Sequence, residues 1–380
     1  MKKTARFLSL MIATLMVVLS FAGCGAADNS NVFVLGISGP MTGTASTYGN
    51  AVVNGAQIAV DKINAAGGIN GYKIKLIYQD DEATVDKAKT AYEKLMDNGM
   101  QVFIGCVTSD SSIACNDLIK ADGILQITPS ASAIEAAVNP NSFRVCFTDP
   151  LQGTKMAEYV YNTLGYRKAA ACYNQDDSYS TGMYDAFKER FTELGGKIAV
   201  EAPFGKDTSD FNAQITKVAS SGADFIYLPI YAEKAAQILI TADSKGVKLP
   251  FVGGDGLDGI MNYLTGDLGK LAENLIFLTP FVSTDTDPKV QAFTNTFIEK
   301  YDMTPDQFAA DAYDAVYLAK LAIEQAGITA PTAMDNAAVV AAMTQIELDG
   351  LTGKMTFDAS GEPNKDAKVA KIINGEYVAQ

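Results

Sequence analysis

The chain has 380 residues, and its 44 acidic and 30 basic side chains give a formal net charge of −14 without a single histidine. The missing histidine excludes Ser-His-Asp and Cys-His catalysis as well as histidine-ligated metal sites. The acidic balance argues against nucleic acid or an anionic membrane surface as a partner.

The first 24 residues are predicted to be a processing signal rather than part of the fold. Basic residues precede 16 uncharged ones, Phe7 to Ala22, and small residues then lead to Cys24. The run is shorter than the about 20 residues that a transmembrane helix needs. Its ending is similar to a bacterial lipoprotein signal, in which Cys24 becomes the lipid-modified first residue. An ordinary secretory signal cut nearby is the alternative.

Residues 25–31 are small and polar, which predicts a short tether before the folded part. Without the three cations of the leader, 27 basic and 44 acidic residues remain, so the mature chain is more acidic still. Its length suffices for two domains with a large core. We expect an acidic body that stands off the membrane on its tether and lipid.

From Val32 onward, short strand-like runs alternate with longer segments of helical periodicity. This βαβαβ order predicts an α/β fold with a parallel sheet covered by helices on both faces. In such sheets, ligands lie beyond the carboxyl ends of the strands. The expected strands are 32–37, 72–78, 102–104 and 124–127, and the expected helices are 49–66, 85–98 and one that opens near 108–111.

A second unit of similar size begins after a strand over 143–147. The alternation restarts there and predicts another α/β unit, and the end of the chain reads as β-strands with a turn at 361–363. The expected strands are 168–173, 197–202, 224–228, 249–252 and 275–279, and the expected helices are 151–164, 179–194, 211–221, 234–245, 289–301 and 307–325.

Hydroxyl residues follow two of the strands in the first unit. Thr108 and Ser109 open a helix after one strand, and Ser130 and Ser132 follow the next. A helix N-terminus favours a small anion such as a carboxylate by about 0.3 to 2 kcal/mol. A plain N-cap is the alternative interpretation of Thr108 and Ser109.

The remaining cysteines and glycines give no sign of catalysis or of a cofactor. Cys106, Cys115, Cys146 and Cys172 are scattered in apolar segments, which favours buried free thiols. One disulfide outside the cell is the alternative, and the sequence does not identify the pair. The glycine-rich segment 36–43 matches neither GxGxxG nor a P-loop, so we infer no nucleotide and no cofactor.

An ordered set of motifs along the whole mature chain resembles the extracytoplasmic leucine/isoleucine/valine-binding proteins of ABC importers. Each motif is weak alone, whereas their common order is specific. They are Gly39-Pro40-Met41-Thr42-Gly43, Tyr48-Gly49, Asn54-Gly55-Ala56, Ala65-Ala66-Gly67-Gly68, Gln79-Asp80-Asp81, Thr108-Ser109-Asp110-Ser111 and Thr128-Pro129-Ser130-Ala131-Ser132.

The resemblance implies a type I periplasmic binding protein with two Rossmann-like lobes. In that family, three crossings join the lobes, which close over an amino acid. The crossings are expected near 147–148, 279–280 and 364–365. The N-terminal lobe would then comprise 32–147 and 280–364, and the C-terminal lobe 148–279 and 365–380.

The resemblance also implies roles for residues of the first lobe. Ser109 would bind the ligand carboxylate through its hydroxyl and backbone N–H, and Ser130 would offer its carbonyl to the ammonium. Ser132 would contact both charged groups, and Ala131 lies between these two serines. Family members often have Thr at the Ser132 position, so one methyl contact is missing.

Opposite these serines, the resemblance implies an acidic residue and an aromatic wall. Asp255 stands where the family commonly has a Glu paired with the ammonium, whereas nearby Asp258 is expected to matter little. Tyr48, Tyr179 and Tyr231 match wall positions, and Phe308 does so less securely. A disulfide of the family is not reproduced, because Ala83 and Thr108 stand near its positions.

The implied function is a solute-binding lipoprotein that captures a small amino acid and serves an ABC permease and its ATPase. It would be extracytoplasmic, lipid-anchored, and not an enzyme. Leucine, isoleucine and valine are the favoured ligands; aromatic amino acids, amides and small carboxylates are alternatives. A ligand-sensing receptor of the same fold is the alternative function.

Overall fold

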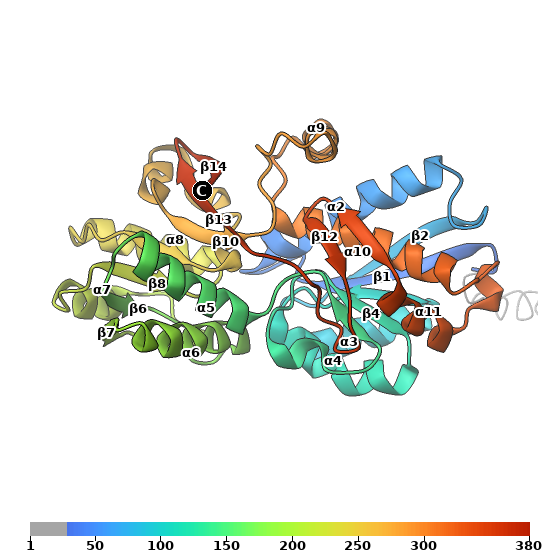
Figure 1. Cartoon of the computed structure of the whole chain (residues 1–380), viewed down its shortest axis with the longest axis horizontal. Helices are drawn as coiled ribbons and strands as arrows, with labels where there is room; N and C mark the ends of the chain where they lie inside the picture. The colour runs from blue at the N-terminus through green and yellow to red at the C-terminus, as the bar shows by residue number, and fades with distance from the viewer. Residues whose placement is uncertain (1–28) are drawn as a thin grey trace, which may run out of the picture.

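The computed structural model describes residues 29–380, which form two lobes side by side (Figure 1). Cys24 and the predicted leader lie outside the described residues. The N-terminal part of the chain shares one lobe with the orange and red helices that come from beyond residue 300, while the green and yellow middle part forms the other. The polypeptide therefore passes between the lobes more than once.

The first lobe is built on a parallel sheet in the order β2-β1-β3-β4-β5. All but the first residue of β1 are buried, as helices on both faces require. The order reverses between β1 and β3, which is where open α/β sheets form ligand crevices. The strands are β1 Val32–Gly39, β2 Lys73–Asp80, β3 Val102–Gly105, β4 Leu125–Thr128 and β5 Ser142–Arg144.

Helices from both ends of the chain cover this sheet. Helices α2 and α10 pack so closely that a Cβ added at Gly55 would lie 1.9 Å from the carbonyl oxygen of Ala309. Glycine is therefore required at this crossing. The helices of this lobe are α2 Ser46–Ala65, α3 Val85–Asp97, α4 Ser109–Asp122, α9 Pro288–Tyr301, α10 Gln307–Gln325 and α11 Asn336–Ala342, beside the hairpin of β11 Glu347–Gly350 and β12 Gly353–Thr356.

The second lobe has a sheet in the order β14-β13-β10-β9-β8-β6-β7. Neighbours from β7 to β10 are parallel, whereas β13 and β14 join antiparallel at one edge. Its strands are β6 Lys168–Ala171, β7 Lys197–Glu201, β8 Phe225–Leu228, β9 Phe251–Gly253, β10 Ile276–Thr279, β13 Lys368–Ile373 and β14 Glu376–Ala379, and its helices are α5 Asp149–Glu158, α6 Ser178–Glu193, α7 Asn212–Ala219 and α8 Ala232–Ser244.

The predicted alternation of strands and helices is confirmed, with three local corrections. The strand expected over 143–147 ends at Arg144, because the chain leaves the sheet there to reach the other lobe. The helix expected over 151–164 begins at Asp149, capped by the Thr148 side chain, and its last turn is a π-helix over Tyr159–Thr163. Helix α11 has no counterpart in the prediction, since it is only seven residues long.

All four cysteines of the described part are buried and unpaired. The sulfur atoms of Cys106 and Cys115 lie 3.9 Å apart, without a disulfide bond between them. In residues 29–380, no helix is long and apolar enough to cross a membrane.

Arg144 organises the loop that follows β4, although its side chain is fully buried. Its guanidinium donates to the carbonyl oxygens of Ala131 and Ala133 at 2.9 and 2.8 Å and to that of Ile134 at 3.0 Å. Its Nε also lies 3.0 Å from a carboxylate oxygen of Glu362. One planar guanidinium therefore holds three carbonyl groups of this loop together, one of which, that of Ala133, also accepts from the Ala136 amide at 3.0 Å.

We expect Arg144→Met to lower the free energy of unfolding by about 3 to 5 kcal/mol, because buried carbonyls would lose their donors. Urea denaturation would measure this loss. Arg190→Met is the matched control: Arg190 pairs with Glu158 and Glu193 at the surface. Its removal should change the midpoint little. Equal midpoints for the two variants would contradict the role given to Arg144.

Candidate functional site

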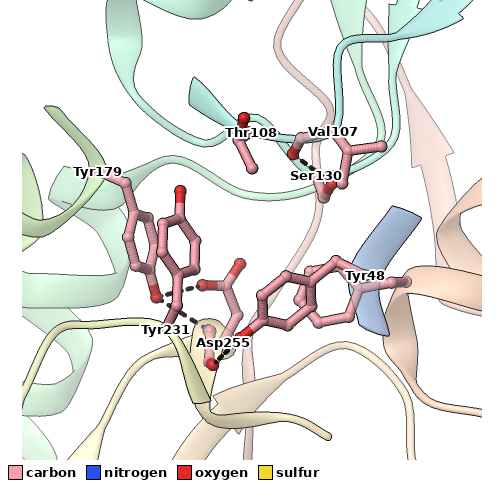
Figure 2. A pocket seen from close by; sticks show the side chains of 9 residues that line it. Tyr48, Val107, Thr108, Ser130, Tyr179, Tyr231 and Asp255 are labelled. Carbon is pink, nitrogen blue, oxygen red and sulfur yellow. Dashed lines mark hydrogen bonds between the residues drawn. The ribbon is translucent and has the colours of Figure 1, made fainter. Parts of the chain in front are cut away.

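A pocket lies between the lobes, where loops after the carboxyl ends of strands from both sheets face each other. In Figure 2, Val107, Thr108 and Ser130 lie on one side of this pocket and Tyr179, Tyr231 and Asp255 on the other. Both groups follow parallel strands, as expected for ligand sites in such sheets. The described lining residues are Tyr48, Val107, Thr108, Ser130, Tyr179, Tyr231, Asp255, Gly256 and Phe308.

The start of α4 forms the first wall. The helix begins at Ser109, which confirms the predicted helix start, and Thr108 is its N-cap residue. The Thr108 hydroxyl is buried without a hydrogen-bond partner in the described structure, so it does not cap the helix and is free for a ligand. The first amides of α4 have no partners within the helix. This wall therefore offers donors to an anion.

The loop after β4 completes this wall. The Ser130 hydroxyl donates to the carbonyl oxygen of Val107 at 2.7 Å, and Ser109 Oγ accepts from the Ala133 amide at 3.1 Å. Both serine hydroxyls thus tie the loops to each other. The Ser132 hydroxyl is buried without a partner in the described structure.

Tyr179, Tyr231 and Asp255 form the opposite wall. The Tyr179 hydroxyl donates to Asp255 Oδ1 at 2.9 Å and accepts from the Gly256 amide at 2.8 Å. The rings of Tyr179 and Tyr231 stack with centroids 4.9 Å apart and planes 12° apart. These contacts fix the direction of the Asp255 carboxylate and leave two ring faces as an apolar surface.

Tyr48 joins the two lobes. Its hydroxyl, carried by α2, donates to the Gly256 carbonyl and accepts from the Ala232 amide, both at 2.7 Å, and both partners belong to the other lobe. The Ser178 amide also reaches Asp110 Oδ1 across the gap at 3.3 Å. The lobes are therefore in contact, and the structure represents a closed arrangement.

Closure leaves very little room in the pocket. The space open to the centre of a water-sized sphere is about 10 Å³, which suits about one water molecule. The Tyr48 ring packs against Phe308, with centroids 4.5 Å apart, and against Tyr231 at 5.6 Å. A ligand larger than water must therefore enter while the lobes are apart or displace these rings.

Electrostatics single out Asp255, which is 3% exposed. Burial raises the pKa of its carboxyl to about 6, even though the Tyr179 hydroxyl stabilises the charged form. Burial and the Asp255 charge also raise the pKa of fully buried Asp149. Among the described residues, neither carboxylate forms an ion pair with Lys or Arg. A ligand cation would relieve this uncompensated negative charge.

The structure brings five of the predicted ligand-binding residues together around the pocket: Tyr48, Ser130, Tyr179, Tyr231 and Asp255. Phe308 also lines the pocket. Ser109, Ala131 and Ser132 are buried and are not among the residues that line it in this closed arrangement.

Val107, Thr108 and Gly256 also line the pocket, although they were not among the predicted ligand contacts. The Thr108-Ser109 pair at a helix start was the available signal for Thr108. Asp258 is fully buried and accepts from the Gln307 amide at 3.0 Å, and it does not line this pocket; that it matters little for binding here stays a prediction. In residues 29–380 no group of three or more acidic or cysteine side chains is arranged to hold a metal ion.

The family described as periplasmic binding protein matches residues 33–376. The chain belongs to this family. The Leu/Ile/Val-binding protein BraC3 of Rhizobium johnstonii is 30% identical over 358 residues, 93% of this chain and 94% of the relative. LivJ of Streptococcus pneumoniae, solved in complex with isoleucine, has a TM-score of 0.82 at 28% identity over 92% of this chain and all of LivJ.

A more distant structural neighbour shows the fold alone. The solute-binding protein of R. palustris, solved in complex with benzoate, has a TM-score of 0.83 at 23% identity and covers 92% of this chain and 95% of its own. This periplasmic binding protein thus has the predicted type I fold with two lobes and resembles the leucine/isoleucine/valine-binding group. It is an extracytoplasmic solute-binding protein of the branched-chain amino acid ABC transporter type and not an enzyme.

We expect Tyr48→Phe to favour the open arrangement, because the Ala232 amide and the Gly256 carbonyl lose their shared partner when the lobes close. The closed arrangement should lose about 1 to 3 kcal/mol of stability relative to the open one. Small-angle scattering of the free protein should give a larger radius of gyration than for wild type. Tyr78→Phe, on a ring that is 53% exposed, is the control. A variant as compact as wild type would show that this hydroxyl does not hold the lobes together.

Asp255→Asn should stabilise the ligand-free protein at pH 8. The folded pKa is raised above the unfolded value, so the charged carboxylate costs stability above pH 6 and this cost fades as the pH falls towards 4. The gain is on the order of 2 to 3 kcal/mol at pH 8. Thermal denaturation at pH 8 and pH 4 would test this, with exposed Asp267→Asn as the control. An equal effect at both pH values would contradict the assignment.

Proposed function

We propose that the protein captures a free zwitterionic amino acid, with leucine, isoleucine and valine favoured, and presents it to an ABC permease. The single observation that carries this proposal is the polarity of the pocket. Donors at the start of α4 face a buried, unpaired carboxylate at Asp255. A zwitterionic amino acid carries the two complementary charged groups, a carboxylate and an ammonium, on one carbon atom.

The carboxylate of the ligand would lie against the start of α4. Thr108 supplies a free hydroxyl, and Ser109 supplies its amide, because its hydroxyl is already engaged with Ala133. The ammonium would lie near the Ser130 carbonyl and the Asp255 carboxylate, with the Ser132 hydroxyl within the same wall. An aspartate reaches less far than the glutamate common in the family, and lobe closure would bring it near enough.

The apolar side chain would contact the rings of Tyr48, Tyr179, Tyr231 and Phe308. These rings leave a narrow space, which favours a compact aliphatic side chain. The Leu/Ile/Val-binding protein BraC3 and the isoleucine complex of LivJ support the same ligands. Benzoate, bound by a neighbour of this fold, lacks the ammonium that Asp255 would pair with.

The proposal also covers the membrane anchor and the limits of the two lobes. Cys24 would carry the lipid after cleavage of residues 1–24, and 25–31 would be the tether. The polypeptide would pass from one lobe to the other at the three predicted crossings. A receptor that signals its loaded state is the second candidate, because closure would serve recognition by a receptor as well as by a permease.

Calorimetry with leucine, isoleucine and valine should show one site per chain, whereas N-acetyl-leucine and leucinamide should bind far more weakly. Asp255→Asn should cost about 2 to 5 kcal/mol of binding free energy.

The affinity of wild type for leucine should be constant between about pH 7 and pH 8, where the ligand ammonium is charged, and fall below about pH 6. The reason is that the ammonium needs a charged Asp255, whose pKa without ligand is about 6. Asp267→Asn, on a side chain that is 96% exposed, is the control. Equal binding of leucine and leucinamide, or an Asp255→Asn variant of native affinity, would refute the assignment of the charges.

A further inference from the structure

A second, larger hollow of about 770 Å³ lies between the lobes. Its walls come from the start of α2, the end of α9 and the loop to α10 in one lobe, and from the loop after β9 and the β13–β14 turn in the other. Figure 1 shows α9 and β14 on the same side of the molecule. The volume is within the range of about 300 to 1,000 Å³ that is usual for small-molecule sites.

The charged residues that line this hollow are all acidic. Asp258 and Glu376 belong to one lobe and Asp302 and Asp306 to the other, and no lysine or arginine is among the described lining residues. The asparagines Asn50, Asn54 and Asn262 add polar groups. Such a hollow attracts cations and repels anions.

Asp258 has an oxygen that is left without a partner. Its side chain is fully buried, its Oδ2 accepts from the Gln307 amide at 3.0 Å, and its Oδ1 has no hydrogen-bond partner in the described structure. Asp306 of the opposite lobe is close by, because a Cβ added at Gly259 would lie 3.8 Å from Asp306 Oδ2. Burial and the Asp306 charge both raise the pKa of Asp258. Asp306 Oδ1 accepts from the Ala309 amide at 3.0 Å, so two carboxyl groups from opposite lobes line this hollow with no lysine or arginine among the described lining residues.

The rest of the wall is apolar. Ile298 and Met303, which are 42% and 49% exposed, are two of the large hydrophobic residues that the surface leaves uncovered, and both line the hollow. Phe297 and Met261 line it as well. A bare metal ion would leave these side chains exposed, and a metal needs more oxygen ligands than the two neighbouring carboxyl groups supply.

We propose that this hollow is a second ligand site, which binds a primary organic ammonium ion with an apolar body. The ammonium would sit against Asp258 and Asp306, and the body would cover Ile298 and Met303. This inference goes beyond the proposed function, since it assigns a separate site for a cation. Because the occupant touches both lobes, it would favour closure and tighten binding at the first pocket, and the coupling would be reciprocal.

Phenethylamine is a suitable probe, with neutral 2-phenylethanol and calcium chloride as comparisons. Saturation-transfer NMR and calorimetry on the mature protein without any amino acid should show saturable binding of phenethylamine and at least tenfold weaker binding of 2-phenylethanol. Because no amino acid is present, the result does not depend on the ligand assigned to the first pocket. Equal binding of the alcohol, or binding of calcium alone, would overturn the proposal.

Four substitutions test where phenethylamine binds in the protein. Asp258→Asn should weaken the binding of phenethylamine at least tenfold. Met303→Lys should do the same, because it puts a cation in the hollow; Met303 is exposed, so this substitution should not disturb folding. Ile240→Lys on α8, also an exposed apolar position, is the matched control and should bind as wild type does. Asp255→Asn should also retain binding.

Loss of binding in Asp255→Asn would place the probe in the first pocket and overturn the proposal. Binding that neither Asp258→Asn nor Met303→Lys weakens would overturn it too.

Discussion

The organising constraint of this molecule is that carboxylates are buried between the lobes without cations beside them. Asp255 is the central case: its direction is fixed by Tyr179, its pKa is raised by burial, and the described structure gives it no basic partner. A buried unpaired charge costs several kcal/mol, and a cation that enters with a ligand removes that cost. The same physical conflict at Asp258 marks the second hollow, so one constraint accounts for both candidate sites.

The basic groups that are buried serve the scaffold instead. Arg144 binds the carbonyls of the loop after β4, and Lys365 donates to the Val145 carbonyl, to Asp311 Oδ1 and to the Thr352 hydroxyl. These contacts anchor segments that lie near the predicted crossings. These two buried basic groups thus have partners inside the framework, while the Thr108 hydroxyl of the pocket wall is left for a ligand.

Closure of the lobes brings the unpaired polar groups of the two walls to one ligand. The two walls belong to different lobes, so only a closed arrangement lets donors and acceptors reach one small ligand. Tyr48 already bridges the lobes through its hydroxyl, and the pocket holds about one water in this arrangement. Capture of a ligand therefore requires that the lobes first move apart. The rings that fill the pocket limit the size of the ligand side chain that fits when the lobes close again.

The amino-acid sequence by itself determined the alternation of strands and helices, because buried parallel strands and amphipathic helices have distinct periodicities. The ends of two parallel strands also indicated that the hydroxyl residues around Thr108 and Ser130 would gather at one edge of a sheet, whereas the role of Asp255 came from the family resemblance. Tertiary structure decided which hydroxyls face the pocket: Ser109 is engaged by Ala133, whereas the neighbouring Thr108 is free. It also decided the burial of Asp258, whose partner Gln307 lies 49 residues away in the other lobe. Local sequence carries no information on such pairings, because they depend on how two separately folded lobes meet.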